Sequence, residues 1–406
     1  MPDYDFLIGI DWATDAHQLC GLDAAGTVRT ERRVLHSGAG LQELVAGLAG
    51  LGSAPARIAV ALEVPRGAII DTLLAHGFHV FAVNPKQLDR FRDRHTVAGA
   101  KDDRRDAFVL ADALRTDRPA FRRVHAEDPR VTQLRELSRL YDELTEEHTR
   151  LSHRLREQLY RFFPQPLALC PAADEGWLWT LLERAPTPAA AQRLRPSTLR
   201  ALVAEHRLRR FTADALYAAL QAPALPVASG TAAAAAEHVA MLLPRLRLVH
   251  EQRTRCERRL EQLLQALAGG DRQEHRDVII IRSVAGIGTV VAATMLTEAS
   301  EALARRDYQM LRAHAGSAPV TRQSGKSRLV SMRRSCNHRL RTAVFHWARN
   351  SIRLDPHARA HYDRLRKRHG HARALRGVAD RLLSMLTAML TTGTLSDPAR
   401  RHACAS

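Results

Sequence analysis

Cysteine is scarce in this sequence, and the few cysteines are scattered. The chain has five of them, far apart and without metal-ligand spacing: Cys20, Cys170, Cys256, Cys336 and Cys404. An odd and dispersed set of cysteines excludes a disulfide framework and a zinc site of the usual pattern. We therefore expect a protein of the reducing cytoplasm.

A long hydrophobic run is also missing. The most apolar window, residues 278–297, contains Arg282 and several glycines, whereas a membrane-spanning helix needs about 20 mainly apolar residues. The start of the chain has no charged segment followed by an apolar one, so we expect no signal peptide. The sequence thus predicts no membrane partner.

Acidic residues are too few to balance the basic ones. Lys and Arg total 61 and Asp and Glu total 43, which gives a formal net charge of +18 and a pI near 10.8. Polyanions are the natural partners of such a protein. Only four of these cations are lysine. Arginine suits bidentate phosphate binding, although a GC-rich genome produces the same ratio of arginine to lysine.

The first hundred residues predict an α/β domain with an RNase H-like fold, over residues 1–125. Three strands come first, with a tight turn at Asp23-Ala-Ala-Gly26 before the third. The expected strands are 6–11, 17–22, 28–35, 57–62 and 78–83, and the expected helices are 41–51, 67–76 and a third from 85 onward. In this order of elements the first and fourth strands lie side by side in a mixed sheet. A length of 406 residues predicts two or three domains in all.

Heptad repeats predict two long helices within residues 130–270. The first has apolar residues in two registers: Leu134, Tyr141, His148, Leu155 and Phe162, with Leu137, Leu144 and Leu151. The second has the same pattern, with Arg253 as its exception: Val239, Leu246, Leu260 and Leu267, with Leu242, Val249, Cys256 and Leu263. Such helices are expected to form an antiparallel coiled coil, within one chain or between two. The Pro- and Ala-rich segment between them, residues 164–235, has mixed helical character and no assignable chemistry, and its alanine run is interpreted as a hinge or weak cap.

The last third of the chain is predicted to be a mainly α-helical domain over residues 275–395, followed by a tail at 396–406. Between Arg322 and Arg376 the sequence has sixteen Arg and Lys residues but two acids, Asp355 and Asp363. A solvated helix face does not need so many cations. This stretch therefore predicts a phosphate-binding surface.

Four carboxylates are expected to meet in the first domain. Asp11 ends the first strand, Glu63 ends the fourth, and Asp103 and Asp106 begin the helix after the fifth. The i, i+3 spacing puts Asp103 and Asp106 on one helix face, whereas Asp102 points about 100° away. Oxygen-only ligands favour Mg²⁺ or Mn²⁺, and two such ions activate phosphodiester oxygens. The alternative is that Asp11 merely ends a strand and the helical pair caps a helix N-terminus.

A glycine-containing turn is predicted between two helices in the last third. In the stretch Ser283-Val-Ala-Gly-Ile-Gly288, the backbone N–H groups around Gly286 and Gly288 suit contact with a DNA phosphate. A glycine that allows two helices to pack closely explains the same pattern nearly as well.

A polar segment broken by glycine, Val320-Thr-Arg-Gln-Ser-Gly-Lys-Ser-Arg328, is interpreted as a loop amid cations. Ser324 is a candidate nucleophile because charge developing on phosphorus needs nearby cations, here Arg322, Lys326 and Arg328. Spacing alone does not separate Ser324 from the serines that follow it: Ser327, Ser331 and Ser335. A plain phosphate-contact loop also has this composition, and Arg333 and Arg334 complete the cations expected to bind nucleic acid.

Several of these motifs together resemble one protein family. They are Ile8-Gly-Ile-Asp11, Leu62-Glu63, Asn84-Pro85, Lys101-Asp-Asp-Arg-Arg-Asp-Ala107, Ala285-Gly-Ile-Gly288, Ala315-Gly316 and Arg322-Gln-Ser-Gly325. The chain is similar to the DEDD transposases of the insertion-sequence-one-ten family over nearly its whole length, except for about 164–235. The family's Lys-x-Asp-x-x-Asp-Ala pattern selects Asp103 and Asp106 over Asp102. Its Ser-Gly dipeptide indicates Ser324 as the catalytic serine.

The resemblance implies an RNA-guided serine recombinase with a RuvC-like domain and a C-terminal transposase domain. Ser324 would attack the DNA phosphodiester and form a 5′-phosphoserine, assisted by metal ions at Asp11, Glu63, Asp103 and Asp106. The implied partners are DNA, a structured noncoding guide RNA, and further copies of the chain in a dimer or tetramer, with the carboxylates of one protomer meeting the serine of another. The expected location is the bacterial nucleoid.

The sequence departs from the family pattern at two places. Glu63 is followed by Val-Pro-Arg-Gly, which leaves the carboxylate in place, and residues 317–322 replace the family's Leu-x-Pro-Arg, which keeps Ser327 open as the nucleophile. A metal-dependent Holliday-junction nuclease is the alternative enzyme, since it needs the four carboxylates but no serine. A non-catalytic nucleic-acid scaffold is disfavoured, because inward carboxylates weaken a polyanion-binding surface unless metal is bound.

Overall fold

The computed structural model describes residues 3–63, 67–94, 102–125, 128–270, 273–325 and 327–397. The chain divides into two compact units, Met1–Asp128 and Pro129–Ser406. Lys101, Lys326 and the tail beyond residue 397 lie outside the described residues. None of the described helices is both long enough and apolar enough to cross a membrane.

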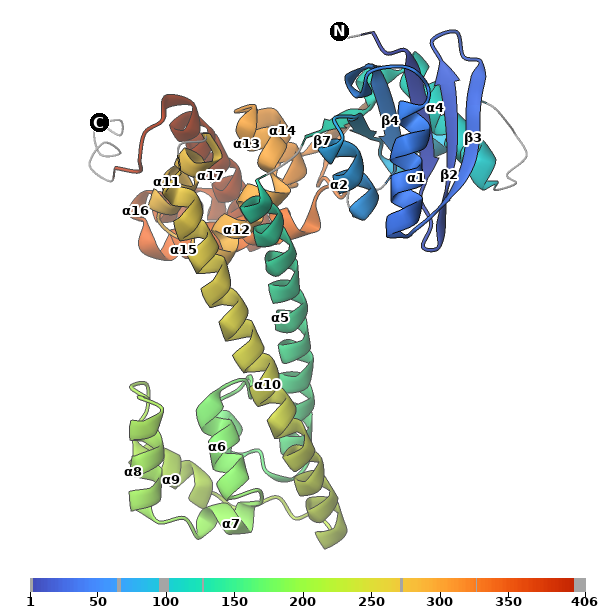
Figure 1. Ribbon diagram of the computed structural model, residues 1–406. Helices are drawn as coiled ribbons and strands as arrows, with labels where there is room; N and C mark the ends of the chain where they lie inside the picture. Colours follow the sequence, from blue (N-terminus) through green and yellow to red (C-terminus); the bar gives the residue numbers. More distant parts are fainter. Residues whose placement is uncertain are drawn as a thin grey trace. The chain divides into compact units, whose positions relative to one another are not determined.

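The first unit is built on a mixed sheet, coloured blue to cyan in Figure 1. Its strands are β1 (Phe6–Asp11), β2 (Ala16–Asp23), β3 (Val28–Leu35), β4 (Ile58–Leu62), β5 (His79–Ala82) and β6 (Arg122–Val124). They lie in the order β3-β2-β1-β4-β5-β6. Strands β1, β2 and β3 are antiparallel, and β1 pairs with β4 in parallel, as the sequence predicted for the first and fourth strands. β6 was not predicted, because it has three residues and its two arginines are exposed.

Helices cover both faces of this sheet. They are α1 (Gly38–Ala49), α2 (Ala68–Ala75), α3 (Pro85–Arg92) and α4 (Asp103–Thr116). Successive residues of a strand point to opposite faces. Ile8 and Ile10 of β1 accordingly pack in one core with α1 and α2, whereas Leu7 packs in a second core with α3 and α4. Asp11 continues the alternation of Leu7 and Gly9, which places it on the face that α4 covers.

Gly9 allows α4 to lie directly against β1. A Cβ atom at this position would lie 2.0 Å from the Ala107 carbonyl oxygen and 2.6 Å from the Ala111 backbone nitrogen. Both atoms belong to the backbone of α4, so no side-chain rotation relieves the contact. The first turn of α4, which contains Asp106, is therefore held close to the end of β1.

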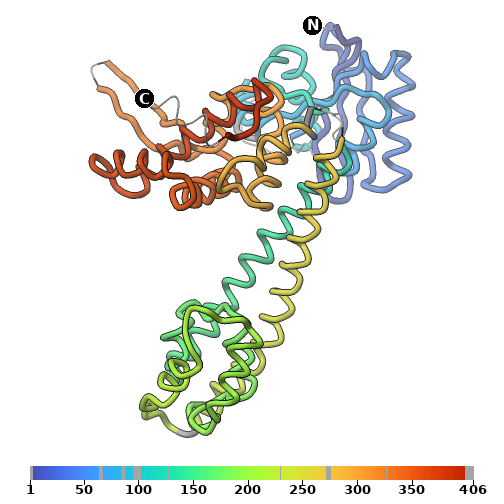
Figure 2. The backbone as a smooth tube through the Cα atoms, turned by 90° about the vertical axis from the view of Figure 1, so that its left-hand side faces the viewer, coloured from blue at the N-terminus to red at the C-terminus, as the bar shows by residue number. Residues whose placement is uncertain are grey.

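The second unit begins with two long helices, α5 (Pro129–Phe162) and α10 (Ser229–Ala268), which run side by side in opposite directions in both views (Figure 1, Figure 2). The Cys256 Sγ donates to the Leu137 carbonyl oxygen at 3.2 Å, and the His148 and His250 rings lie 5.8 Å apart. The two helices thus pair antiparallel within one chain. Their supercoiling as a coiled coil stays a prediction.

Short helices fill the segment between them: α6 (Gly176–Arg184), α7 (Pro188–Gln192), α8 (Pro196–Glu205) and α9 (Ala213–Gln221). They pack on the helix pair around the fully buried Trp177 and Trp179. The interpretation of the alanine run as a hinge was wrong, because α10 begins at Ser229 and the run forms its first turns. Alanine is the strongest helix former, so a run of alanines extends a helix.

The remaining part of the second unit is mainly helical. Its helices are α11 (Gln273–Ser283), α12 (Thr289–Glu298), α13 (Ser300–Ala304), α14 (Tyr308–His314), α15 (His338–Leu354), α16 (Pro356–Arg366) and α17 (His371–Thr392). One hairpin interrupts them, formed by β7 (Val320–Ser324) and β8 (Ser327–Ser331). The prediction of an irregular loop here was wrong. The strands carry almost no apolar alternation, and Gly325, with a φ of +55°, supplies the left-handed conformation that their tight turn requires.

The contact at Gly9 leads to a test of the first unit. We expect Gly9→Ala to destabilise this unit by about 3 kcal/mol, because the added methyl overpacks the contact between β1 and α4. Hydrogen exchange of peptides from residues 1–128, measured by mass spectrometry, reports the change. Gly38→Ala is the matched control, since its Cβ meets no atom within 4 Å. Equal exchange in the two variants would contradict the packing argument.

Candidate active site

The sheet topology brings two of the predicted carboxylates to one edge. β1 and β4 are parallel neighbours, with Ile10 opposite Leu62. Asp11 is the last residue of β1, and Glu63 follows β4 directly. Both side chains are therefore level with each other at the carboxyl ends of the two strands. Asp11 and Glu63 are half-buried.

Helix α4 adds the other two carboxylates. Asp103 is its first residue and is exposed, whereas Asp106 lies one turn later and is 2% exposed. Asp102 caps the helix by accepting a hydrogen bond from the Arg104 backbone nitrogen at 3.1 Å. The capping role considered for Asp103 and Asp106 thus belongs to Asp102.

The four carboxylates share one electrostatic environment. Burial raises the pKa of Asp11 to about 6, and the neighbouring charges of Asp106 and Asp103 act in the same direction. Glu63 adds to this effect, while Arg92 opposes it. Like charges that crowd together disfavour ionisation, so Asp103, Asp106 and Glu63 lie close enough to Asp11 to disfavour its ionised form. The structure brings the sequence-predicted set together.

Arg92 neutralises the most buried member of the set. Its Nε and Nη2 donate to the two oxygens of Asp106 at 2.7 and 2.8 Å, which is the bidentate geometry of a strong ion pair. Sequence reasoning missed Arg92, because α3 is polar and one arginine among many gives no signal. Asp106 is turned toward Arg92, and the four carboxylates do not converge on one point within 4.8 Å.

Three residues of the second unit do have potential ligand atoms within 4.8 Å of one another, but their chemistry does not suit a metal ion. Cys170, Asp174 and Glu175 lie within 4.8 Å of one another. Burial raises the pKa of Cys170 to about 11, so the thiol keeps its proton. Glu175 is already paired with Arg210, whose Nη1 lies 2.6 Å from its carboxylate. These residues join the short helices to one another.

Ser324 lies at the end of β7, directly opposite Ser327 of β8. Residues opposite each other in an antiparallel pair share a face of the ribbon. Ser324, Ser327 and Arg322 therefore lie on one face, and Arg328, opposite Gln323, lies on the other. All of these side chains are exposed. Among the described cations of the hairpin that were predicted to bind phosphate, Arg322 lies on the same face as Ser324 and Ser327.

The turn between α11 and α12 is held against α15. Gly286 has a φ of +88°, and a Cβ there would lie 2.7 Å from the Ser351 Oγ and 2.9 Å from its backbone nitrogen. The Ser351 Oγ and the Trp347 Nε1 both donate to the Ala285 carbonyl oxygen. Close packing therefore accounts for Gly286. Gly288 has open space beside it, and its contact with a phosphate stays a prediction.

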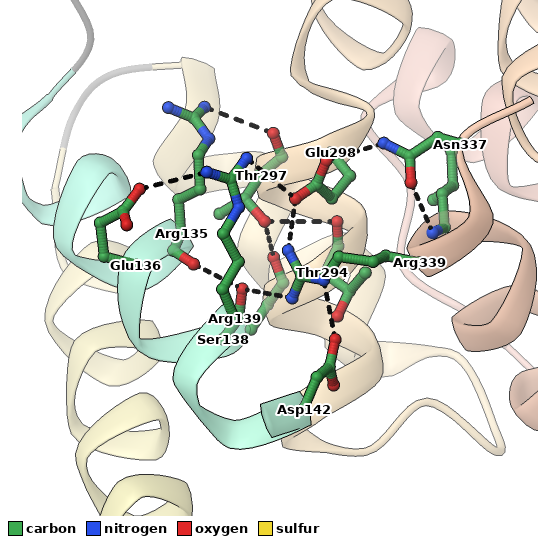
Figure 3. A network of polar contacts seen from close by, with 12 residues as sticks. Arg135, Glu136, Ser138, Arg139, Asp142, Thr294, Thr297, Glu298, Asn337 and Arg339 are labelled. Carbon is green, nitrogen blue, oxygen red and sulfur yellow. Dashed lines mark hydrogen bonds and ion pairs between the residues drawn. The ribbon is translucent and has the colours of Figure 1, made fainter. Parts of the chain in front are cut away.

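A polar network fixes the start of α15, just after the hairpin (Figure 3). Glu298, at the end of α12, accepts hydrogen bonds from the Asn337 Nδ2 at 2.7 Å and from the Arg339 Nη1. Arg139 of α5 also pairs with it. Burial acts to raise the pKa of Glu298, but Asn337 and the neighbouring arginines lower it further than burial raises it. Asn337 in turn caps α15 by accepting from the Leu340 backbone nitrogen.

Comparison with known proteins finds two family models that match separate stretches of the chain. A family model described as "Transposase" matches residues 8–164, which include the four carboxylates. A second, described as "Transposase IS116/IS110/IS902 family", matches residues 279–363, which include Ser324. The y4uE protein of Sinorhizobium fredii is 47% identical over 207 residues, which are 50% of this chain and 58% of that protein.

Two Streptomyces coelicolor proteins match over most of their length. The one named "Mini-circle putative transposase for IS117" is 33% identical over 97% of this chain and 96% of its own. The uncharacterized 43.6 kDa protein of insertion element IS110 is 30% identical over 97% of this chain and 95% of its own. The chain belongs to the IS110 family of insertion-sequence transposases, which cut DNA. Since both matches span the chain, the segment 164–235 is not an insertion peculiar to it.

The raised pKa of Asp11 predicts a stability change with pH. The folded chain holds the Asp11 proton up to about pH 6, compared with 3.8 for an ordinary aspartate, so ionising Asp11 destabilises the fold increasingly between these values. Without divalent cations, Asp11→Asn should therefore be more stable than wild type at pH 8, by about 1 kcal/mol after allowance for solvent screening. The difference should vanish near pH 3. Urea unfolding in EDTA measures the difference in the free energy of unfolding, and Asp15→Asn, at an exposed position, is the control. If Asp11→Asn is less stable than wild type at pH 8, the argument that Asp11 is crowded by its neighbours is refuted.

The Glu298 network leads to a second test. Glu298→Gln should destabilise the second unit by about 2 kcal/mol at pH 7, because the partly buried Arg139 and Arg339 lose the carboxylate that they share and keep only Glu136 and Asp142. The pKa of Glu298 is lowered, so its contribution is present above the ordinary pKa of 4.5 and is lost as pH falls through the lower folded value. Urea unfolding at pH 7 and pH 3 checks this. Glu136→Gln, whose side chain is 65% exposed, should change stability little.

Proposed function

We propose that this transposase cuts and rejoins DNA through a 5′-phosphoserine at Ser324, assisted by Mg²⁺ or Mn²⁺ at Asp11, Glu63, Asp103 and Asp106. The observation that carries the proposal is the crowding of four carboxylates at the carboxyl ends of β1 and β4 and the start of α4. The order of strands and the position of these residues favour an RNase H-like, RuvC-like first unit.

The four carboxylates fit a hard divalent cation. Their oxygens are the ligands that Mg²⁺ and Mn²⁺ prefer, and the pKa of Asp11 is raised by burial and, after it, by the neighbouring carboxylates. Such a cation, when bound, stabilises charge on phosphodiester oxygens. Asp106 must then leave Arg92, at least in part, to contribute an oxygen. Arg92 would in that state be free to bind a phosphate oxygen.

The proposed attack of serine on DNA exchanges one phosphate ester for another and consumes no water. The Ser324 Oγ forms a bond to phosphorus and its proton passes to a base, while the bond from phosphorus to the 3′ oxygen breaks and that oxygen takes up a proton. The products are a 5′-phosphoserine and a strand with a free 3′-hydroxyl. Attack by a 3′-hydroxyl on the phosphoserine reverses these bonds and rejoins DNA. Arg322, on the same face of the hairpin as Ser324, would offset charge developing on the phosphate.

RNA guidance and oligomer formation are supported by the family resemblance. The formal charge of +18 suits two polyanions, the DNA and a structured noncoding RNA. Assembly into a dimer or tetramer would let the carboxylates of one chain meet the serine of another. A metal-dependent Holliday-junction nuclease remains the second candidate, favoured by the fact that the carboxylates belong to a unit without the serine.

One experiment separates the two candidates. Purified protein is incubated with Mg²⁺, DNA spanning the end of the element and RNA from the adjacent noncoding region, and the products are run on a denaturing gel. We expect a covalent protein–DNA band in wild type and in Ser327→Ala, and at least about 10³-fold less in Ser324→Ala, because the nucleophile is gone. Asp11→Asn should also abolish the band. Cut DNA without an adduct in wild type, Ser324→Ala and Ser327→Ala, with no cutting in Asp11→Asn, would support the nuclease.

A further inference from the structure

Four arginines gather at the base of the β7–β8 hairpin. Arg333 follows β8, Arg341 lies on α15, and Arg373 and Arg376 lie on α17. The Arg341 Nη2 donates to the Arg333 carbonyl oxygen at 2.6 Å. Burial, together with the charges of Arg341 and Arg373, lowers the pKa of Arg376. We call these four residues the arginine cluster.

The cluster lacks a counter-ion within the part of the chain that the structure describes. None of its four guanidinium groups forms an ion pair with a described carboxylate. The Nε atoms of Arg333, Arg341 and Arg376 are buried and have no hydrogen-bond partner. Burying cationic N–H groups without acceptors costs several kcal/mol, and placing like charges together adds to this cost.

Several other partly buried arginines of the same unit have a carboxylate partner. Arg306 pairs with Asp277, Arg312 with Asp380 and Arg339 with Glu298, and the side chains of these arginines are 18%, 23% and 24% exposed. The Nε of Arg156 is also buried without a partner, but it stands alone on α5. At the arginine cluster three such Nε atoms occur together without a described carboxylate, which favours an external anion as their partner.

A structural role explains part of the cluster. Arg341 lies beside Gly316, where a Cβ would be 2.8 Å from its Nε and Nη2, and it bonds the Arg333 carbonyl oxygen. It thus joins the two ends of the hairpin. This accounts for one nitrogen of Arg341. Arg376 has the Met332 sulfur, 3.0 Å away, as its polar contact, and Arg373 is exposed without a described partner, so the fold does not account for them.

We propose that the arginine cluster binds one phosphodiester group of the DNA strand that reaches Ser324. The charges of Arg341 and Arg373 reach Arg376, and a phosphate accepts bidentate hydrogen bonds from arginine, so neighbouring guanidinium groups suit its oxygens. The cluster lies at the base of the hairpin and Ser324 at its tip, four residues of β7 or roughly 13 Å away, so a DNA strand that runs along the hairpin from the serine would reach it. This inference rests on the proposed function, because it takes DNA as the substrate at the hairpin.

The test compares two double variants in a Ser324→Ala background, which prevents covalent trapping. One is Arg373→Gln with Arg376→Gln. The matched control is Arg255→Gln with Arg258→Gln, which removes the same charge from exposed positions on α10, outside the stretch predicted to bind phosphate. Binding of a fluorescent DNA duplex and of an RNA hairpin is measured by anisotropy over a range of salt concentrations, and thermal unfolding checks the fold. Arg376→Gln alone replaces the first variant if that one unfolds.

We expect the cluster variant to bind DNA about tenfold more weakly, with a log–log salt slope smaller by about 1, because one phosphate contact is lost. The control should weaken binding about twofold at most. Equal losses in both variants, or a loss confined to RNA, would overturn the site. The covalent-adduct assay tests the proposed function separately. If wild type forms no adduct, the serine mechanism is refuted, but the difference in DNA binding between the two double variants still tests the arginine cluster.

Discussion

The close approach of α4 to β1 at Gly9 is the contact on which the candidate active site depends. Parallel pairing of β1 and β4 by itself places Asp11 and Glu63 at one sheet edge. The third and fourth carboxylates join them because the backbone of α4 lies where a side chain at residue 9 would otherwise be. The hydrophobic cores on either side of the sheet then hold the carboxylates together despite their mutual repulsion. Packing energy is thus used to assemble charges that would separate in solution.

The two units carry opposite unbalanced charges. In the first, Arg92 neutralises Asp106, while Asp11 is left with a raised pKa beside its acidic neighbours. In the second, arginines at the base of the hairpin have no described carboxylate, although comparable arginines nearby are paired. A divalent cation and a phosphodiester are the two species that would balance these charges. A DNA phosphate that arrives with its metal ions is complementary to both, and a neutral ligand is complementary to neither.

Much of the first unit could be predicted from sequence because its chemistry follows simple periodicities. Short apolar stretches between turn signals marked β1 to β5, and the i, i+3 spacing marked Asp103 and Asp106. The prediction failed where the pattern is polar or very short. β6 has three residues, and the hairpin with Ser324 is exposed on both faces, so neither contains the alternation of a half-buried strand. Arg92 was missed because its role depends on one contact across space, which no local pattern encodes.

The hairpin also limits how Ser324 can act. An exposed hydroxyl is a weak nucleophile at neutral pH unless a base or metal activates it. Among the residues that the structure describes, no side chain hydrogen-bonds Ser324 or its opposite neighbour Ser327, and Arg322 on the same face cannot accept a proton. The described residues of the hairpin thus offer Ser324 no base. In the proposed reaction a base or metal ion would have to reach the serine, and the carboxylates of the first unit are acceptors of the required kind.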